Sequence, residues 1–142
     1  CYNRGVVANQ PLPPAMPGYD PNYQGYQYDP DGAKQLLVDA GYPNGFETEL
    51  YVMNTDPNPR IAQSMQQDLA AIGIKAAVKS LAQATVIASG GDGTAPMLWS
   101  GGMAWIADYP DPSNFYGPIL GCGGAVAGGW NWSQYCKKKK YN

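Results

Sequence analysis

Histidine is absent from this 142-residue sequence, and cysteines number only three. Without histidine the chain lacks the commonest general base and the commonest metal ligand of proteins, and no Gly-x-Ser-x-Gly motif supplies a nucleophile. One catalytic arrangement remains open, in which Asp108 and Asp111 act as paired glycosidase carboxylates, although two aspartates in one proline-rich loop need not face each other. We predict that the chain is not an enzyme, and we expect neither a cofactor nor a metal.

Basic residues are also few, and apolar runs are short. Nine Lys and Arg stand against eleven Asp and Glu, and four of the nine lie together at 137–140, so no basic face is left for nucleic acid. No apolar stretch approaches the ~20 residues of a membrane helix. No signal peptide is recognisable, so any export signal was removed or lies outside this sequence.

The three cysteines are unevenly placed. Cys122 and Cys136 flank a segment rich in glycine and tryptophan, and Cys1 stands alone. A disulfide between Cys122 and Cys136 would close a loop of about 15 residues and stabilise the fold by roughly 3 kcal/mol. Two reduced thiols are the alternative. Cys1 is expected to be unpaired, with an N-terminal lipid anchor as its other interpretation.

Glycine and proline are abundant, with 18 and 13 residues, and aromatic residues make up 12% of the chain. This composition favours one ordered domain over residues 1–142 with long loops between short elements. Residues 1–28 carry most of the early proline and tyrosine and are expected to form an extended, ordered coil. Their tyrosines, including Tyr19, Tyr23, Tyr26 and Tyr28, are expected to be half-buried against the domain, with an exposed face for a partner as the alternative.

Helix and strand patterns alternate after residue 28. Asp29 and Pro30 favour a helix start, and Gly41 favours a helix end. Alternation of apolar and polar residues predicts strands that follow Phe46 and Ile74. The predicted helices span residues 30–40, 58–72, 81–89 and 112–120, and the predicted strands span residues 46–53, 74–79 and 96–103.

The helices that connect the predicted strands indicate the fold class. Two strands joined by a helix form a right-handed crossover, so the first two strands should be parallel. The apolar character of residues 96–103 predicts a central strand that is buried on both faces. The expected fold is α/β, a mixed, partly parallel sheet flanked by helices, with long Pro/Gly-rich loops.

The segment of residues 105–112, which we call the binding loop, comes directly after the third predicted strand. Ligands of open α/β sheets bind at the carboxyl ends of strands. Trp105 offers a flat apolar surface, and the Asp108 carboxylate can pair with a ligand ammonium group. The alternative makes Asp108 a turn carboxylate that bonds to the local backbone. For Asp111, which precedes Pro112 and could cap the next helix, this local role is the expected one.

Several segments in this order resemble the C-terminal lobe of the dipeptide- and oligopeptide-binding proteins of ABC importers (cluster C periplasmic binding proteins). The resemblance extends over nearly the whole chain, and the ordered set is specific although each piece alone is weak. Its segments are Pro11-Leu12-Pro13-Pro14, Tyr28-Asp29-Pro30, Ala33-Lys34-Gln35-Leu36-Leu37, Ala40-Gly41-Tyr42-Pro43-Asn44-Gly45-Phe46, Ile72-Gly73-Ile74-Lys75, Ala107-Asp108-Tyr109-Pro110-Asp111-Pro112 and Asn131-Trp132-Ser133-Gln134-Tyr135-Cys136.

This resemblance implies one lobe of a two-lobed solute-binding protein with a peptide or other small solute in the interlobe cleft. Asp108 matches the aspartate that receives the ligand's amino group, and Trp105 matches an aromatic residue beside it. The backbone of Gly102, Met103 and Ala104 matches the strand end that lines the cleft. The family's cysteine pair supports the Cys122–Cys136 disulfide.

The resemblance also implies an organisation and partners. Residues 1–28 are coil, residues 29–103 form the βα core, and residues 104–142 hold the ligand loop and the disulfide-linked segment. The partners would be the missing N-terminal lobe and a membrane permease, with the binding protein itself monomeric. Its location would be extracytoplasmic, in the periplasm or lipid-anchored at the cell surface. The lysine run at 137–140 departs from the mixed helical sequence of the family.

Two other functions remain open. Trp99, Trp130 and Trp132 would serve as platforms for an oligosaccharide, although buried packing is the commoner role of tryptophan. An isolated lobe could instead act through its surface as an interaction fragment. Asn131-Trp132-Ser133 also fits an N-glycosylation acceptor, which we expect to be accidental.

Overall fold

The computed structural model describes residues 7–101 and 105–136. Its helices and strands alternate as the sequence patterns predict, and each predicted helix is confirmed to within a few residues. None of the helices among the described residues is long and apolar enough to cross a membrane. The elements are α1 (Pro30–Asp39), β1 (Glu47–Met53), α2 (Asn58–Ala71), β2 (Lys75–Leu81), α3 (Gln83–Gly91), β3 (Met97–Trp99), α4 (Ser113–Leu120) and the short 3-10 helix η1 (Cys122–Gly124).

Helix α1 begins and ends as its sequence predicts. The Asp29 side chain accepts a hydrogen bond from the backbone N–H of Gly32 at 2.9 Å, and Pro30 occupies the first turn, where its missing N–H costs nothing. Gly41 comes after the helix with φ +86°, a conformation that favours glycine. None of the helix residues is buried, and Leu36 remains 70% exposed. The apolar side of α1 is therefore only partly covered, with Ala33 and Leu37 half-buried.

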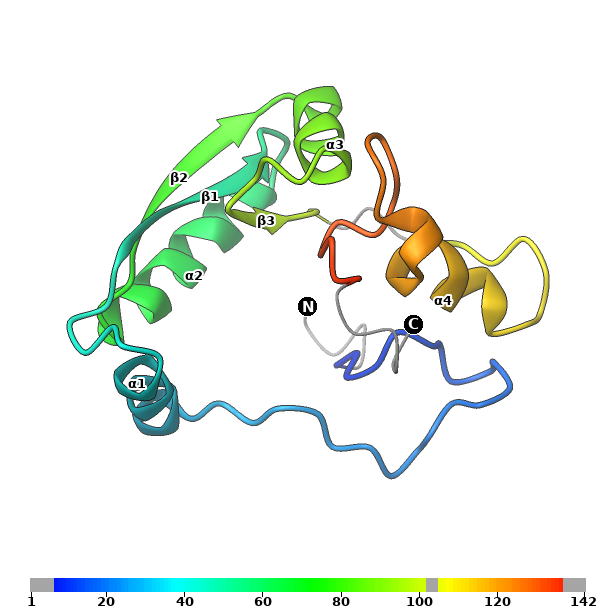
Figure 1. Ribbon diagram of the computed structural model, residues 1–142, viewed down its shortest axis with the longest axis horizontal. Helices are drawn as coiled ribbons and strands as arrows, with labels where there is room; N and C mark the ends of the chain where they lie inside the picture. Colours follow the sequence, from blue (N-terminus) through cyan, green and yellow to red (C-terminus); the bar gives the residue numbers. More distant parts are fainter. Residues whose placement is uncertain (1–6, 102–104, 137–142) are drawn as a thin grey trace.

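The three strands form one parallel sheet in the order β2-β1-β3. The predicted parallel pairing of the first two strands is confirmed, with Leu50 opposite Val78. Leu50 and Val52 of β1 form the main core with Ala62 of α2 and Ala76 of β2. Figure 1 shows α2 lying along one face of β1 and β2. Burial of these apolar side chains is the principal force that holds the βαβ unit together.

The prediction of a central third strand is wrong. Strand β1 is the middle strand, and β3 is a three-residue strand at the edge of the described sheet, with all three residues only half-buried. Met97 and Trp99 pack against the main core, which explains their apolar character without burial on a second face. An apolar run bounded by glycine does not distinguish an edge strand packed on one face from a central strand.

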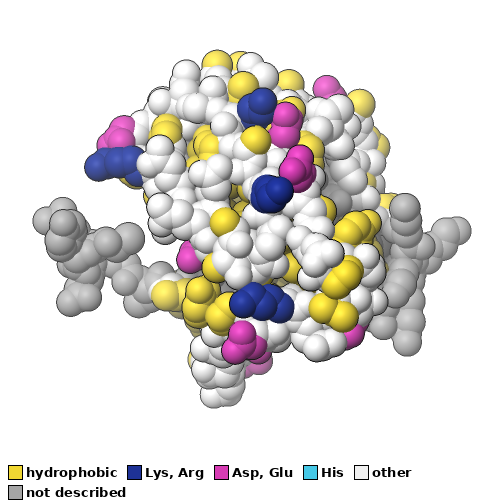
Figure 2. All heavy atoms as spheres, turned by 90° about the vertical axis from the view of Figure 1, so that its left-hand side faces the viewer, with side chains coloured by type: hydrophobic (Ala, Val, Ile, Leu, Met, Phe, Trp, Pro, Cys, Tyr) yellow, Lys and Arg dark blue, Asp and Glu magenta, His cyan; other side chains and the backbone are white. Residues whose placement is uncertain are grey.

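The outer face of β1 and β2 is polar. Glu47 pairs with Lys75, and Glu49 with Lys79, each at 3.3 Å across the two strands. Figure 2 shows the side of the molecule that is on the left in Figure 1, where acidic and basic side chains of the described residues adjoin each other. Because these pairs are exposed, they contribute little to stability. Their effect is to keep this face solvated.

A second core joins the N-terminal coil to α4. Leu12 and Met16 of the coil bury against Phe115, and Trp105 packs at their side. The Gln10 side chain donates to the backbone oxygen of Asp20 at 2.7 Å and accepts from its N–H at 3.1 Å. The described part of the coil, from residue 7, contains no helix or strand, as expected.

The expectation that the coil tyrosines are half-buried is wrong for two of them. Tyr26 is 102% exposed and Tyr28 is 77% exposed, whereas Tyr19 packs against the second core. Figure 1 shows the reason: the coil leaves α4 and crosses to α1 as an extended segment with little beside it. Only the first part of the coil therefore has a surface on which to bury aromatic rings.

Candidate binding site

The binding loop connects the sheet to α4. It begins six residues after the end of β3, and its last residue, Pro112, directly precedes α4. Gly101 adopts φ +65°, a conformation that favours glycine, and a Cβ there would lie 2.8 Å from Cγ of the buried Asn58, so a larger residue would be strained where the chain leaves the sheet. Three of the predicted site residues, Gly102, Met103 and Ala104, lie outside the described residues. The geometry of the candidate site therefore rests on the binding loop from Trp105 onward and on the first turn of α4.

Asp108 and Trp105 are brought together by a residue that the sequence patterns did not single out, Asn114 of α4. Its Oδ1 accepts from the backbone N–H of Asp108 at 3.1 Å and from the Trp105 indole N–H at 3.4 Å. Its Nδ2 donates to Oδ2 of Asp108 at 3.3 Å. A polar residue beside Phe115 in the first turn of a short helix was the available signal, because a buried amide needs partners.

The Asp108 side chain is exposed, whereas Asn114 is 5% exposed. One carboxylate oxygen of Asp108 is held by the amide, and within the described part of the chain Oδ1 has no hydrogen-bond partner. The side chain does not bond to its own backbone, as a plain turn carboxylate would. The Asp108 carboxylate is therefore held in place by Asn114 while its Oδ1 atom remains open to a partner outside the loop.

Asp111 has the local role that the sequence predicted for it. Its Oδ1 accepts from the backbone N–H of Ser113 at 2.8 Å, at the start of α4. Two hydrogen bonds hold the pKa of Asp111 below its ordinary value of 3.8. The bond from the Ser113 hydroxyl has the larger effect, and the bond from the Ser113 backbone N–H has the smaller one. We conclude that Asp111 is a turn carboxylate that bonds to the local backbone just before α4, whose N-cap residue is Pro112.

Replacing Ser113 with alanine should raise the pKa of Asp111, because the larger of the two lowering hydrogen bonds is lost while the backbone bond remains. A carboxyl with a lowered pKa stabilises the fold above its unfolded pKa, and that contribution disappears as pH falls through the folded pKa. The acid-side loss of stability begins near the unfolded pKa in both proteins, and in Ser113→Ala it should be smaller and complete at a higher pH. Carboxyl-carbon NMR titration measures the shift, and an unchanged midpoint would contradict it.

Trp105 is half-buried and belongs partly to the second core. It lines a cavity of about 480 Å³ between the binding loop and the N-terminal coil, together with Ile106, Ala107, Phe115 and Leu12. The Asp108 side chain is not among the lining groups of this cavity. Trp105 and Asp108 thus both bond to Asn114 but have different surroundings. The indole faces the apolar cavity, and the carboxylate faces the solvent.

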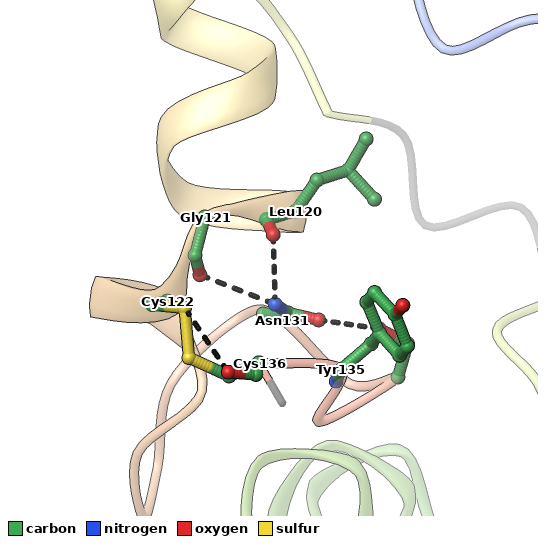
Figure 3. Close-up of a disulfide and its surroundings, with 7 residues drawn as sticks. Leu120, Gly121, Cys122, Asn131, Tyr135 and Cys136 are labelled. Carbon is green, nitrogen blue, oxygen red and sulfur yellow. Dashed lines mark hydrogen bonds between the residues drawn. A yellow bond between two sulfur atoms is a disulfide. The ribbon is translucent and has the colours of Figure 1, made fainter. Parts of the chain in front are cut away.

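The segment after α4 is closed by the predicted disulfide, which joins Cys122 to Cys136 with Cα atoms 5.2 Å apart. Figure 3 shows Asn131 beside this bond, directed at the end of α4. Its Nδ2 donates to the carbonyls of Leu120 at 3.0 Å and Gly121 at 3.1 Å. Because Asn131 is fully buried and its amide is engaged, it is not a glycan acceptor in the folded protein.

The other tryptophans give no support to a carbohydrate platform. Trp99 packs against the main core. Trp132 lies against α3, where a Cβ on Gly90 would meet its ring at 2.5 Å, and its indole N–H donates to Gly129 at 3.1 Å. Trp130 is 44% exposed and sits between two other rings, with centroids 5.8 Å from both Trp105 and Trp132. These rings are used mainly in packing.

A parallel sheet with flanking helices and a loop at the carboxyl end of a strand is an arrangement that binds ligands in many open α/β proteins. The profile described as "Bacterial extracellular solute-binding proteins, family 5 Middle" matches residues 1–126. The chain belongs to this family. Membership in a family of extracytoplasmic binding proteins confirms the predictions of its location and of its non-enzymatic class.

Similar proteins agree with this assignment. Heme-binding protein A of Haemophilus influenzae is 40% identical over 82% of this chain and 22% of its own length. The dipeptide-binding protein of Escherichia coli K12 is 34% identical over 94% of this chain and 25% of its own length. The chain thus spans about a quarter of the curated relatives that it matches.

Solved structures give the same fold. The periplasmic binding protein DppA of Helicobacter pylori in complex with the peptide STSA superposes with a TM-score of 0.79 at 36% identity, covering 88% of this chain and 24% of that one. A dipeptide-binding protein of Pseudoalteromonas sp. SM9913 in complex with Met-Leu gives a TM-score of 0.80 at 33% identity, covering 96% and 27%. The expected fold class is therefore confirmed.

Proposed function

We propose that this chain forms part of the C-terminal lobe of a two-lobed peptide-binding protein of an ABC importer. The exposed Asp108 carboxylate, fixed on one side and open on the other, carries the proposal. It would receive the α-amino group of a short peptide, since a charge-assisted hydrogen bond to an ammonium ion is strong in a partly desolvated cleft. The similarity to proteins described in complex with STSA and with Met-Leu supports a peptide ligand.

The proposal extends to the other residues of the predicted site. Trp105 would provide an apolar wall beside the amino terminus of the peptide, and the backbone at Gly102, Met103 and Ala104 would approach the ligand closely. A second lobe outside this sequence would hold the other half of the ligand. The complete protein would act as a monomer and deliver its solute to a membrane permease.

Asp108→Asn tests the proposal in the two-lobed protein. The substitution keeps the shape of the side chain but removes its charge, and we expect binding of a dipeptide with a free amino group to weaken by about 2 kcal/mol, roughly 30-fold. Titration calorimetry measures the change. The matched control is Asp111→Asn in the same loop, which should leave the affinity near that of the wild type because this carboxylate bonds to the backbone of Ser113.

Two results would contradict the proposal. One is an Asp108→Asn protein that binds the dipeptide as tightly as the wild type, and the other is an equal loss in both variants. Mass spectrometry of the material released on denaturation identifies the natural ligand. A peptide supports the proposal, whereas haem, which the name of one relative suggests, would replace it.

A further inference from the structure

Asn114 is almost completely shielded from solvent and is not among the groups proposed to touch the ligand, yet it bonds to both side chains of the candidate site. We infer that Asn114 is a positioning residue, which fixes the Asp108 carboxylate and the Trp105 indole relative to each other before an amine ligand arrives. This inference rests on the proposed function, because it assigns the residue that makes the same site effective.

The chemistry of the amide fixes its orientation. The groups that face Oδ1 of Asn114 are the backbone N–H of Asp108 and the indole N–H of Trp105, which are both donors. The group that faces Nδ2 is a carboxylate oxygen of Asp108, which is an acceptor. Exchanging the oxygen and nitrogen of the amide would oppose donor to donor and acceptor to acceptor, so only one orientation satisfies all the contacts.

Burial makes these contacts persistent. Asn114 is 5% exposed, and it lies in the first turn of α4 beside Phe115 of the second core. Water has little access to compete for its hydrogen bonds, and an unpaired amide there would be unfavourable. The Asp108 side chain, by contrast, is exposed and would rotate freely if it were held by nothing.

This difference gives Asn114 its proposed role. By holding Oδ2 and the backbone N–H of Asp108, the amide selects one rotamer and leaves Oδ1 available to a ligand. A ligand that pairs with a side chain already ordered loses less conformational entropy on binding. The same amide fixes the plane of the Trp105 ring, so the charged and the aromatic parts of the site keep a constant separation.

A double-mutant cycle in the two-lobed protein tests the inference, with affinity for a free-amino dipeptide measured by calorimetry. We expect Asn114→Ala to weaken binding about tenfold, and we expect the double variant Asn114→Ala with Asp108→Asn to bind within about twofold of Asp108→Asn alone. Such non-additivity arises only if Asn114 acts through Asp108. A purely structural role would give additive losses or no loss of affinity.

The control variant is Ile119→Ala, which truncates another partly buried residue of α4 that packs against the second core. It should lower the unfolding temperature as Asn114→Ala does, but leave the dipeptide affinity within about twofold of the wild type. Equal losses of affinity in Ile119→Ala and Asn114→Ala would overturn the inference, because loosening of α4 would then explain both.

Hydrogen exchange in the ligand-free wild type gives a result that needs neither a folded variant nor a ligand. The Asp108 amide proton and the Trp105 indole proton should both exchange slowly in NMR spectra, and exchange at the rate of an open loop would overturn the inference. An Asp108→Asn protein with unchanged affinity would defeat the proposed function instead, while slow exchange would still establish the contacts of Asn114. The two failures are therefore distinguishable.

Discussion

Replacing Gly45 with alanine is expected to lower the free energy of unfolding by about 2 to 4 kcal/mol. A Cβ on Gly45 would lie 1.9 Å from the backbone oxygen of Gly73, a contact that no side-chain movement relieves. Gly45 also has φ +71°, which costs other residues about 1 kcal/mol, and overpacking against a fixed neighbour adds about 1 to 3 kcal/mol. The site lies where the chain enters β1 beside the end of α2.

Gly41 provides the matched control. It has φ +86°, but a Cβ there would meet no atom within 4 Å. Gly41→Ala should therefore cost only the conformational term, about 1 kcal/mol. Urea unfolding of the two variants and the wild type measures the difference between them. Equal losses would show that the approach of the Gly45 and Gly73 backbones is not a constraint on the fold.

Removal of the disulfide is the second change with a large expected effect. The double variant Cys122→Ser with Cys136→Ser should lose about 3 kcal/mol of stability, since the bond closes a loop of about 15 residues. A loss of this size is a substantial part of the roughly 5 to 15 kcal/mol that stabilises a typical domain. The segment between the cysteines also packs against α3, where Gln134 donates to the carbonyl of Gly91 at 3.2 Å.

Thermal unfolding with and without a reducing agent measures this contribution. Reduction should lower the unfolding temperature of the wild type to that of the double variant and should leave the double variant unchanged. A wild-type unfolding temperature that does not respond to reduction would contradict the prediction. It would mean that the contacts of the loop with α3 and with the end of α4 hold the segment without the covalent bond.

Local patterns were sufficient for much of the fold. The Asp29 cap, the glycine ends of the helices and the alternation after Phe46 are signals carried by neighbouring residues, so they predict elements well. The parallel pairing was predictable from the length of the helix between the strands. The edge position of β3 could not be predicted, because it depends on which strands lie beside it in space.

The candidate site was predicted in part. Asp108 and Trp105 stand out in the sequence because a carboxylate and an indole lie in one loop after a predicted strand. Asn114 does not, because its importance comes from two partners that precede it by six and nine residues and meet it only when the loop folds back on α4. The packing of Leu12 against Phe115 is a contact across the length of the chain, and no periodicity encodes it.

Trp130 contacts both Trp105 and Trp132, so the three indole rings can interact electronically. Ring centroids 5.8 Å apart are close enough for their electronic transitions to couple, with one pair nearly parallel and the other steeply inclined. The first ring belongs to the binding loop and the other two to the disulfide-linked segment, which packs on α3. The chain therefore contains its own chromophore, whose exciton signal reports whether the binding loop and the disulfide-linked segment are correctly packed against each other.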